Sequence, residues 1–522
     1  MKTIIKNSFY QLLAIYTAII LVIALGFLGR YALYFNILAL IIAILGISII
    51  NVKPLDKESK LNNKLHFTLI LIAIILILAF RIIPYINNSI PIGYDAGIYK
   101  YGIESFKENG FQAQDWIKAS MSPLFLYLTF ILSYLFSSQA ILTWLFILSC
   151  LILGITIYFF TKEYFGEREA IISFLIYSVS IIQFKVFEFL YYKNILALIF
   201  LFLALIFYKR EKRALFIIFS VLTGAMHLPT FYIFALSFLI YTFISPIKNN
   251  NKKYNFKLMR DNILNGLMII ILTLVCYFGF IKQAILPLIS PVASSFINPG
   301  TASGTFLSFF QYQFLTLAYL PFSILGLFFL IKSRKFNLLF FLTLVTASIV
   351  YFQLFFFNRF IIHLDIFLII LASLGFSIIT ENKKKLGTLI LALMLLSSAY
   401  LVYNESINTK PGITQSQLDL LIQQITITEQ NSSIISISSQ YSPYVLAYSG
   451  RKTIAPGLFD ENKWNLAQWN EFWATQDTEK TKELLSVYNK PIYLFAGNKA
   501  FNNTCFSLFL EKGANKIYQY IC

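Results

Sequence analysis

One carboxylate between two glycines is the first candidate for chemistry in this sequence. Asp95 lies in Ile92-Gly-Tyr-Asp-Ala-Gly97, after an apolar run and at the start of a helical stretch that runs to Lys107. A carboxylate beside apolar walls loses hydration, which raises its pKa and suits a general base. Aspartate is also favoured at helix N-termini, so a capping role is the alternative. The neighbouring Tyr94 is a candidate substrate-binding residue.

A short segment between two later apolar runs carries three more charged residues. Lys185, Glu188 and Lys193 fall within ten positions of one another. Lys185 and Glu188 are three residues apart, a spacing that predicts an ion pair on one helix face. Lys193 is left as a candidate for binding an anionic substrate.

Arginine and histidine residues at the ends of apolar runs form the third group. Arg359 begins such a run, and its planar fork matches the oxygen pair of a phosphate, although snorkelling to the lipid headgroups is the alternative. His363 follows one helical turn later. His227 stands at a predicted turn, where it is either a binding residue or a core histidine. Arg81 could also hold phosphate, but Pro84 close by favours snorkelling.

The composition determines the class of protein. Of 522 residues, 58% are hydrophobic and only 13% are charged, and the mean hydropathy is +0.71. Soluble, disordered, collagen-like and disulfide-scaffold proteins have other compositions. The chain is therefore predicted to be a mainly α-helical protein that crosses a membrane many times.

About thirteen apolar runs are candidate membrane spans. They are 8–28, 32–51, 66–84, 139–160, 169–187, 194–207, 213–227, 229–245, 263–281, 312–331, 336–357, 360–379 and 386–403. Together they predict a membrane domain over residues 1–403. The run 8–28 has no small-residue cleavage site after it and is expected to be a retained span.

The net charge of +18 gives the orientation of these spans. Loops on one side hold 23 basic and 8 acidic residues, the opposite loops hold 9 and 6, and the tail holds 10 of each. The positive-inside rule places the first side and the N-terminus in the cytoplasm and the tail outside the cell membrane. This distribution leaves no basic groove for nucleic acid. It also requires residues 121–137 to leave and return on the outer side instead of crossing.

Two outer loops and a polar tail complete the predicted organisation. Loops 85–138 and 282–311 are long enough to build a site, and the second is typical of a lid or an irregular connector. The tail 411–522 is predicted to be a small α/β domain with a mainly parallel sheet. Its expected helices are 414–425, 442–449, 462–486 and 504–513, and its expected strands are 433–438, 491–495 and 516–520.

Cysteine and histidine are sparse. Cys150 and Cys276 fall in apolar runs and are expected in the core. Cys505 and Cys522 both fall in the outer tail, where either a disulfide or two free thiols are possible states. No CxxC or HExxH spacing occurs, so no residue is assigned as a metal ligand.

The arrangement as a whole resembles the GT-C class of integral-membrane glycosyltransferases. That class includes protein O-mannosyltransferases, aminoarabinose transferases and oligosaccharyltransferases. The similar features are the number of spans, an Asp in the first long outer loop, a juxtamembrane helix, a short acidic outer turn, a late outer loop and an outer α/β tail. They cover most of the chain, with two extra spans before the usual first one.

The resemblance implies transfer of a sugar from a polyprenyl- or dolichyl-phosphate donor to a glycan, lipid or protein acceptor on the outer face. Asp95 would be the general base, Arg359 would hold the carrier phosphate, and Glu188 would be a second catalytic acid. The other residues that would line the substrate site are Tyr94, Lys193, His227 and His363. A divalent cation (Mg²⁺ or Mn²⁺) is left open as a cofactor, although no Asp follows Glu188 to complete a carboxylate pair.

The sequence departs from one member of the class and leaves other functions open. The WWDYG motif of oligosaccharyltransferases is absent, since Trp464, Trp469 and Trp473 stand apart, which argues against that family's manner of transfer to Asn. The alternatives are a transporter or flippase of lipid-linked sugars, an O-antigen-polymerase or ligase-like enzyme, and a non-catalytic scaffold. The absence of an internal repeat disfavours the transporter.

Overall fold

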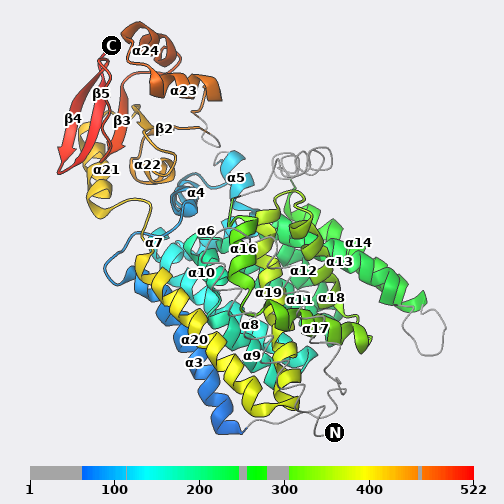
Figure 1. The fold of residues 1–522 in the computed structure, drawn as a ribbon. Coiled ribbons are helices and arrows are strands. Elements are labelled where there is room, and N and C mark those ends of the chain that lie inside the picture. Colours follow the sequence, from blue (N-terminus) through cyan, green and yellow to red (C-terminus); the bar gives the residue numbers. More distant parts are fainter. Residues whose placement is uncertain (1–61, 113–114, 246–255, 279–304, 457–460) are drawn as a thin grey trace.

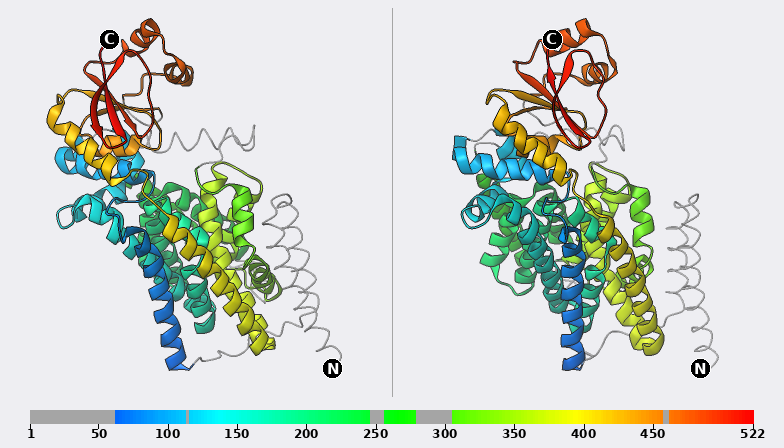
Figure 2. Two further views of the ribbon diagram at one scale, coloured as in Figure 1. Left: turned by 60° about the vertical axis from the view of Figure 1, so that its left-hand side comes forward. Right: turned by 90° about the vertical axis from the view of Figure 1, so that its left-hand side faces the viewer.

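The chain forms a bundle of apolar helices with a small sheet at one end (Figures 1 and 2). The computed structural model describes residues 62–112, 115–245, 256–278, 305–456 and 461–522. The predicted spans 8–28 and 32–51, and most of the loop 282–311, lie outside the described residues. Six described helices are long and apolar enough to cross a membrane, or eight spans if each of two bent pairs counts as one. The predicted class, a mainly helical membrane protein, is confirmed.

The bundle contains fifteen described helical segments. Their bounds are α3 Asn63–Ile82, η1 Ile83–Tyr85, η3 Ile141–Leu145, α8 Phe146–Tyr164, α9 Glu167–Ser178, α10 Ile181–Glu188, α11 Tyr192–Lys209, α12 Arg213–Met226, α13 Leu228–Ile244, α14 Phe256–Cys276, α16 Phe309–Thr316, α17 Leu320–Lys332, α18 Leu338–Tyr351, α19 Phe357–Asn382 and α20 Lys384–Asn408. The bent pairs are α9 with α10, at 52°, and α16 with α17, at 81°.

Helix α19 is the centre of the bundle. Its most apolar 18-residue stretch is entirely buried, whereas the same measure is 28% for α3 and 22% for α20, which lie at the edge. Two glycines allow α17 and α19 to touch: a Cβ on Gly326 would lie 2.0 Å from the Leu371 carbonyl oxygen, and one on Gly375 would lie 2.1 Å from that of Phe322. Small residues at such crossings let apolar helices pack backbone to backbone.

Short helices between α3 and α8 build the first outer loop. They are α4 Asp95–Asn109, η2 Gly110–Gln112, α5 Asp115–Met121, α6 Pro123–Leu132 and α7 Ser138–Ala140. The ten residues of α6 extend about 15 Å, half of the roughly 30 Å of a bilayer core. Helix α6 alone is therefore too short to cross, and the re-entrant interpretation of residues 121–137 stays a prediction.

The tail contains a five-stranded sheet of order β2-β1-β3-β5-β4. Its elements are α21 Gln415–Ile427, β1 Ser433–Ser436, α22 Ser442–Tyr448, β2 Lys452–Ile454, α23 Leu466–Ala474, α24 Thr478–Leu485, β3 Ile492–Gly497, β4 Phe506–Lys512 and β5 Asn515–Tyr520. Strands β2, β1 and β3 are parallel, but β5 is antiparallel to both β3 and β4. The expectation of a mainly parallel sheet is therefore wrong.

The expected helix 504–513 is also wrong, because this segment is strand β4. Gly513 was expected to end a helix. With φ +62° it instead forms the turn of a hairpin in which Lys512 pairs with Asn515. The predicted helix 462–486 is interrupted, since α23 ends at Ala474 and α24 begins at Thr478.

The tail packs directly on the first outer loop. A Cβ on Gly97 of α4 would lie only 2.1 Å from the Pro443 carbonyl oxygen of α22. The Tyr444 hydroxyl lies 2.9 Å from the Gly93 carbonyl oxygen and donates a hydrogen bond to it. The tail therefore holds the loop that carries Asp95.

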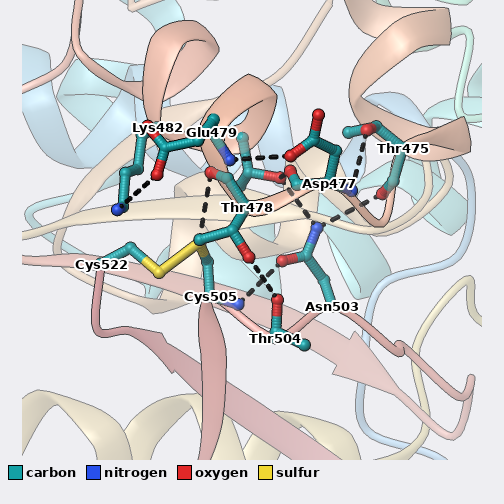
Figure 3. The surroundings of a disulfide bond; sticks show 10 residues. Thr475, Asp477, Thr478, Glu479, Lys482, Asn503, Thr504, Cys505 and Cys522 are labelled. Atoms are coloured by element: carbon teal, nitrogen blue, oxygen red, sulfur yellow. Dashed lines mark hydrogen bonds and ion pairs between the residues drawn. A yellow bond between two sulfur atoms is a disulfide. The ribbon is translucent and has the colours of Figure 1, made fainter.

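Cys505 and Cys522 form a disulfide, which resolves the alternative left open by the sequence (Figure 3). It ties the start of β4 to the residues after β5. Asn503 supports the same corner, since its side-chain amide donates to the Thr481 hydroxyl at 3.0 Å and its Oδ1 accepts from the Cys505 backbone at 3.0 Å.

Breaking this disulfide should destabilise the tail. The sequence separation is 17 residues, and closing a loop of that length contributes about 3 kcal/mol. We expect the double substitution Cys505→Ser, Cys522→Ser to make the tail cleavable at lower protease concentration in the full-length protein. Dithiothreitol should reproduce this effect in the wild-type protein and change nothing further in the double variant. Equal protease resistance of all samples would contradict the expectation.

Candidate active site

A glycine-dependent turn positions Asp95 against the start of α11. Gly93 has φ +97°, and a Cβ there would lie 2.8 Å from the Leu190 Cβ and 2.9 Å from the Glu188 carbonyl oxygen. A larger residue would therefore separate the loop from the turn that joins α10 to α11. This contact brings Asp95 and Lys193 into one neighbourhood.

Asp95 is the first residue of α4, but it does not cap the helix. The N-cap position is Tyr94, and no side chain makes a capping hydrogen bond there. The Asp95 carboxylate instead accepts a hydrogen bond from the Tyr99 hydroxyl, one turn further along the helix. The capping interpretation is therefore wrong, and Asp95 as a whole residue is half-buried.

The surroundings of Asp95 tune its acidity in opposite directions. Burial raises the pKa of the carboxyl above its ordinary value of 3.8, while the positive charges of Lys193 and Arg359 and the Tyr99 hydrogen bond lower it. Burial is the largest of these effects, so the net direction is upward. A raised pKa makes a carboxylate a stronger proton acceptor.

Lys193 lies on the same side of the bundle. Its ammonium group donates to the Ser120 carbonyl of α5 and lies 5.7 Å from the centre of the Tyr99 ring. Its charge interacts with both Asp95 and Arg359. Lys193 therefore links α11, the first outer loop and the start of α19.

Arg359 stands in the first turn of α19 with its head group held by protein. Its Nη2 donates to the Thr305 hydroxyl at 3.1 Å, and its Nε is buried without a hydrogen-bond partner in the described residues. The Tyr191 hydroxyl donates to the carbonyl of the same Thr305. Since the guanidinium is partly buried and acts on Asp95, the snorkelling interpretation is not supported.

His227 and His363 lie beside these cations. The two imidazole rings are parallel within 10°, with centres 6.4 Å apart, and Thr230 stands between them. Lys193 and Arg359 both act electrostatically on His227. Tyr94 lies next to Asp95 with 44% of its surface exposed. The structure thus gathers six of the seven candidate residues.

Glu188 is the seventh, and its carboxylate points into a different interaction. It accepts a hydrogen bond from Lys185 at 2.6 Å, the ion pair predicted from their spacing. Lys185 also binds Glu405 of α20. Glu188 is not among the charged groups that act on Asp95. A catalytic role for Glu188 stays a prediction.

Two other charged residues, Arg81 and Asp365, are buried inside the helix bundle and make hydrogen bonds there. Arg81 is only 1% exposed and lies 5.9 Å from the centre of the Tyr177 ring, so the prediction that it snorkels is wrong. Its guanidinium donates to the Ile77 and Gln183 carbonyls at 3.3 and 3.5 Å. Asp365 is fully buried and accepts hydrogen bonds from Ser180, Gln183 and Tyr319.

The donor set around Asp95 does not fit a divalent cation. The described residues contain no group of three His, Cys, Asp or Glu side chains that could hold a metal ion. The charged neighbours of Asp95 are cations, whereas Mg²⁺ and Mn²⁺ prefer several oxygen ligands. No step below is therefore assigned to a metal.

Four residues of the site were missed in the sequence. Tyr99 could have been found, because position i+4 from Asp95 faces the same side of the helix. Tyr191, Thr230 and Thr305 gave no signal, because their roles depend on contacts between distant segments.

Comparisons with known proteins bear on the fold. No protein-family model and no curated protein matches the sequence. The oligosaccharyltransferase of Archaeoglobus fulgidus in the apo form superposes with a TM-score of 0.60 at 14% identity, covering 84% of this chain and 70% of that one. The oligosaccharyltransferase AglB from Archaeoglobus fulgidus in complex with an inhibitory peptide and a dolichol-phosphate superposes with a TM-score of 0.58 at 13% identity, covering 83% of this chain and 69% of that one.

A second relative in structure is shorter and is covered almost completely. ArnT from Cupriavidus metallidurans bound to undecaprenyl phosphate superposes with a TM-score of 0.57 at 10% identity, covering 88% of this chain and 98% of that one. Both relatives are glycosyltransferases of the GT-C type. The chain therefore has the fold of the GT-C glycosyltransferases, as the arrangement of its spans, loops and tail predicted.

Proposed function

We propose that the chain is a membrane glycosyltransferase that moves a sugar from a polyprenyl- or dolichyl-phosphate donor to an acceptor on the extracytoplasmic face. The observation that carries this proposal is the uncapped Asp95 beside the two cations Lys193 and Arg359. The dolichol-phosphate bound to the Archaeoglobus enzyme and the undecaprenyl phosphate bound to ArnT support a lipid-phosphate donor.

In the proposed reaction Asp95 is the general base. Its carboxylate takes the proton of the acceptor nucleophile as that atom forms a bond to the anomeric carbon of the donor sugar. The bond between the anomeric carbon and the phosphate oxygen breaks, and its electron pair stays on the lipid phosphate. Asp95 then returns the proton to water. The raised pKa of Asp95 favours the first step.

The two cations are proposed to bind the donor phosphate. The carrier phosphate of a lipid-linked sugar has one negative charge and gains a second when the sugar leaves. Arg359 can match two phosphate oxygens with its planar fork, and Lys193 supplies a point charge. We propose that the exposed Tyr94 contacts the substrate from the rim of the site and that the buried His227 contacts it from inside.

The proposed topology places this site and the tail outside the cytoplasm. Helix α11 begins at the site with Lys193 and ends at the basic cluster Lys209–Arg213, which the positive-inside rule assigns to the cytoplasm. The disulfide of the tail supports the same orientation, because disulfides persist in oxidising compartments.

A transfer assay with defined donors tests the function. The full-length protein in nanodiscs is given undecaprenyl- and dolichyl-phosphate hexoses and pentoses labelled in the sugar, with a membrane extract as the source of acceptors. We expect labelled product and an equal amount of released lipid phosphate. Movement of intact donor across vesicles without release of lipid phosphate would overturn the proposal in favour of a flippase.

The role of Glu188 can be tested with a matched control. Glu188 and Glu405 both bind Lys185, so Glu188→Gln and Glu405→Gln each remove one of its two carboxylates. If Glu188 only supports the fold, we expect the two variants to lower transfer equally, by about tenfold or less, the range of one partly exposed ion pair. If Glu188→Gln instead lowered transfer at least about 10²-fold more than Glu405→Gln did, Glu188 would be identified as a catalytic acid.

A further inference from the structure

A chain of buried hydrogen bonds joins His363 to His227 through Thr230. The Thr230 hydroxyl oxygen lies 2.7 Å from Nε2 of His363 and 2.8 Å from Nδ1 of His227. Thr230 is 0% exposed, His363 1% and His227 7%. Each of the two contacts needs one proton between its atoms, so the chain has a direction.

The cap of helix α13 determines that direction. His227 is the N-cap residue, and its Nδ1 accepts a hydrogen bond from the Thr230 backbone N–H at 3.4 Å. A nitrogen that accepts has no proton, so the neutral ring carries its proton on Nε2. The Thr230 hydroxyl then donates to the same Nδ1, and its oxygen accepts from the Nε2–H of His363. This assignment leaves Nδ1 of His363 unprotonated, and that atom is buried without a hydrogen-bond partner in the described residues.

The free end of this chain is the Nε2–H of His227. It lies on the side of the ring away from Thr230, and no described residue accepts a hydrogen bond from it. The cations that act electrostatically on His227 are Lys193 and Arg359, and no carboxylate is among the groups that act on it. A fixed N–H donor beside two cations matches an anionic oxygen.

We propose that Thr230 and His363 are positioning residues that hold His227 as an Nε2–H donor to an oxygen of a lipid phosphate bound by Lys193 and Arg359. The inference rests on the proposed function and adds an indirect role for His363, which does not touch the ligand in this assignment. Its task is to donate to Thr230, so that the threonine hydroxyl is turned toward His227 and away from other acceptors.

The tautomer of His227 can be measured without any activity. The chain has only three histidines, His66, His227 and His363, so ¹⁵N-histidine labelling of the full-length protein gives few signals, which His66→Gln and single substitutions assign. We expect an unprotonated Nδ1 and a protonated Nε2 for His227. Thr230→Val keeps the backbone N–H that donates to Nδ1 but removes the hydroxyl donor, so the Nδ1 signal of His227 should move toward that of a more weakly hydrogen-bonded nitrogen, and Thr230→Ser should restore the wild-type pattern.

Lipid-binding measurements test whether the hydrogen-bond chain from His363 through Thr230 to His227 strengthens phosphate binding. The probes are undecaprenyl phosphate and dolichyl phosphate in nanodiscs, with undecaprenol as the uncharged control. We expect Thr230→Val and His363→Leu to weaken phosphate-lipid binding about tenfold, the value of one hydrogen bond to a charged group. Thr230→Ser should bind like the wild type, and so should His363→Gln, which keeps a side-chain N–H.

The outcomes separate the inference from the proposed function. An unchanged His227 signal in Thr230→Val would overturn the inference, as would a changed signal with unchanged affinity. Failure of the wild-type protein to prefer either phosphate over undecaprenol would overturn the lipid-phosphate donor, and with it the ligand assigned to His227. Loss of binding in Thr230→Val together with rescue by serine supports both.

Discussion

Asp95→Asn is expected to lower sugar transfer by about 10²–10⁴-fold, the range that general-base catalysis contributes. The amide has the shape of the carboxylate and can still accept the Tyr99 hydrogen bond, but it cannot take a proton from the acceptor. Donor binding should be unchanged or tighter, because the substitution removes a negative charge next to Lys193 and Arg359. Single-turnover rates and lipid-phosphate affinity, measured separately, check the two parts.

The matched control for Asp95→Asn is Glu104→Gln. Glu104 is on the same helix and is engaged by Lys100 and Ser138, away from the charged groups that act on Asp95. We expect this variant to retain transfer close to that of the wild type. Transfer within about tenfold of the wild type in Asp95→Asn would contradict the assignment of a general base.

The pH dependence tests the same carboxylate through its titration. The rate constant kcat/KM should fall with decreasing pH as Asp95 becomes protonated, since the protonated form accepts no proton. Burial raises the pKa of Asp95 above 3.8, so this fall should begin at higher pH than for a solvent-exposed aspartate.

A raised pKa in the folded state also means that ionised Asp95 costs stability at neutral pH. The thermal midpoint of Asp95→Asn should therefore equal or exceed that of the wild type, which excludes unfolding as the cause of lost transfer.

Short-range sequence patterns predicted the helices of the bundle and the contacts between neighbouring residues on one helix. Apolar runs gave the helices of the described bundle, since a helix in lipid must satisfy its own backbone. The spacing of Lys185 and Glu188 gave their ion pair, because residues three apart share a helix face. Gly93 and Gly97, which flank Asp95, lie against the α10–α11 turn and α22, contacts that the sequence alone did not predict.

Most of the failures concern contacts between segments that are distant in sequence, and one concerns a hairpin. Arg81 looked like a snorkelling residue because Pro84 follows it, but α3 turns this side chain toward Gln183 and Tyr177 inside the bundle. Residues 504–513 were predicted to be a helix, but residues 506–512 pair with the adjacent strand β5 in a hairpin. The bond from Arg359 to Thr305 and the chain through Thr230 join separate helices and loops, which one sequence does not place together.

Arg359→Gln should reduce kcat more than it weakens donor binding. The leaving phosphate gains a negative charge in the transition state, so an interaction with Arg359 becomes stronger there than in the bound donor. Removing one such donor costs about 10²–10³-fold in kcat. Arg359→Lys keeps the charge but loses the fork that matches two oxygens, so its rate should fall between those of the wild type and glutamine variants. Lys410→Gln, an exposed lysine elsewhere on the chain, controls for general attraction of anionic lipid.

The same substitution should also move the acidic limb of the pH profile. The positive charge of Arg359 lowers the pKa of Asp95, so its removal should raise that pKa further and shift the fall in kcat/KM to higher pH. Lys193→Gln should shift the limb in the same direction, because Lys193 acts on Asp95 with the same sign. If Arg359→Gln lowered the rate but left the limb in place, the arginine would act on the phosphate without sharing a site with Asp95. That result would separate the base from the phosphate site and contradict the mechanism, in which both groups act on one glycosidic bond.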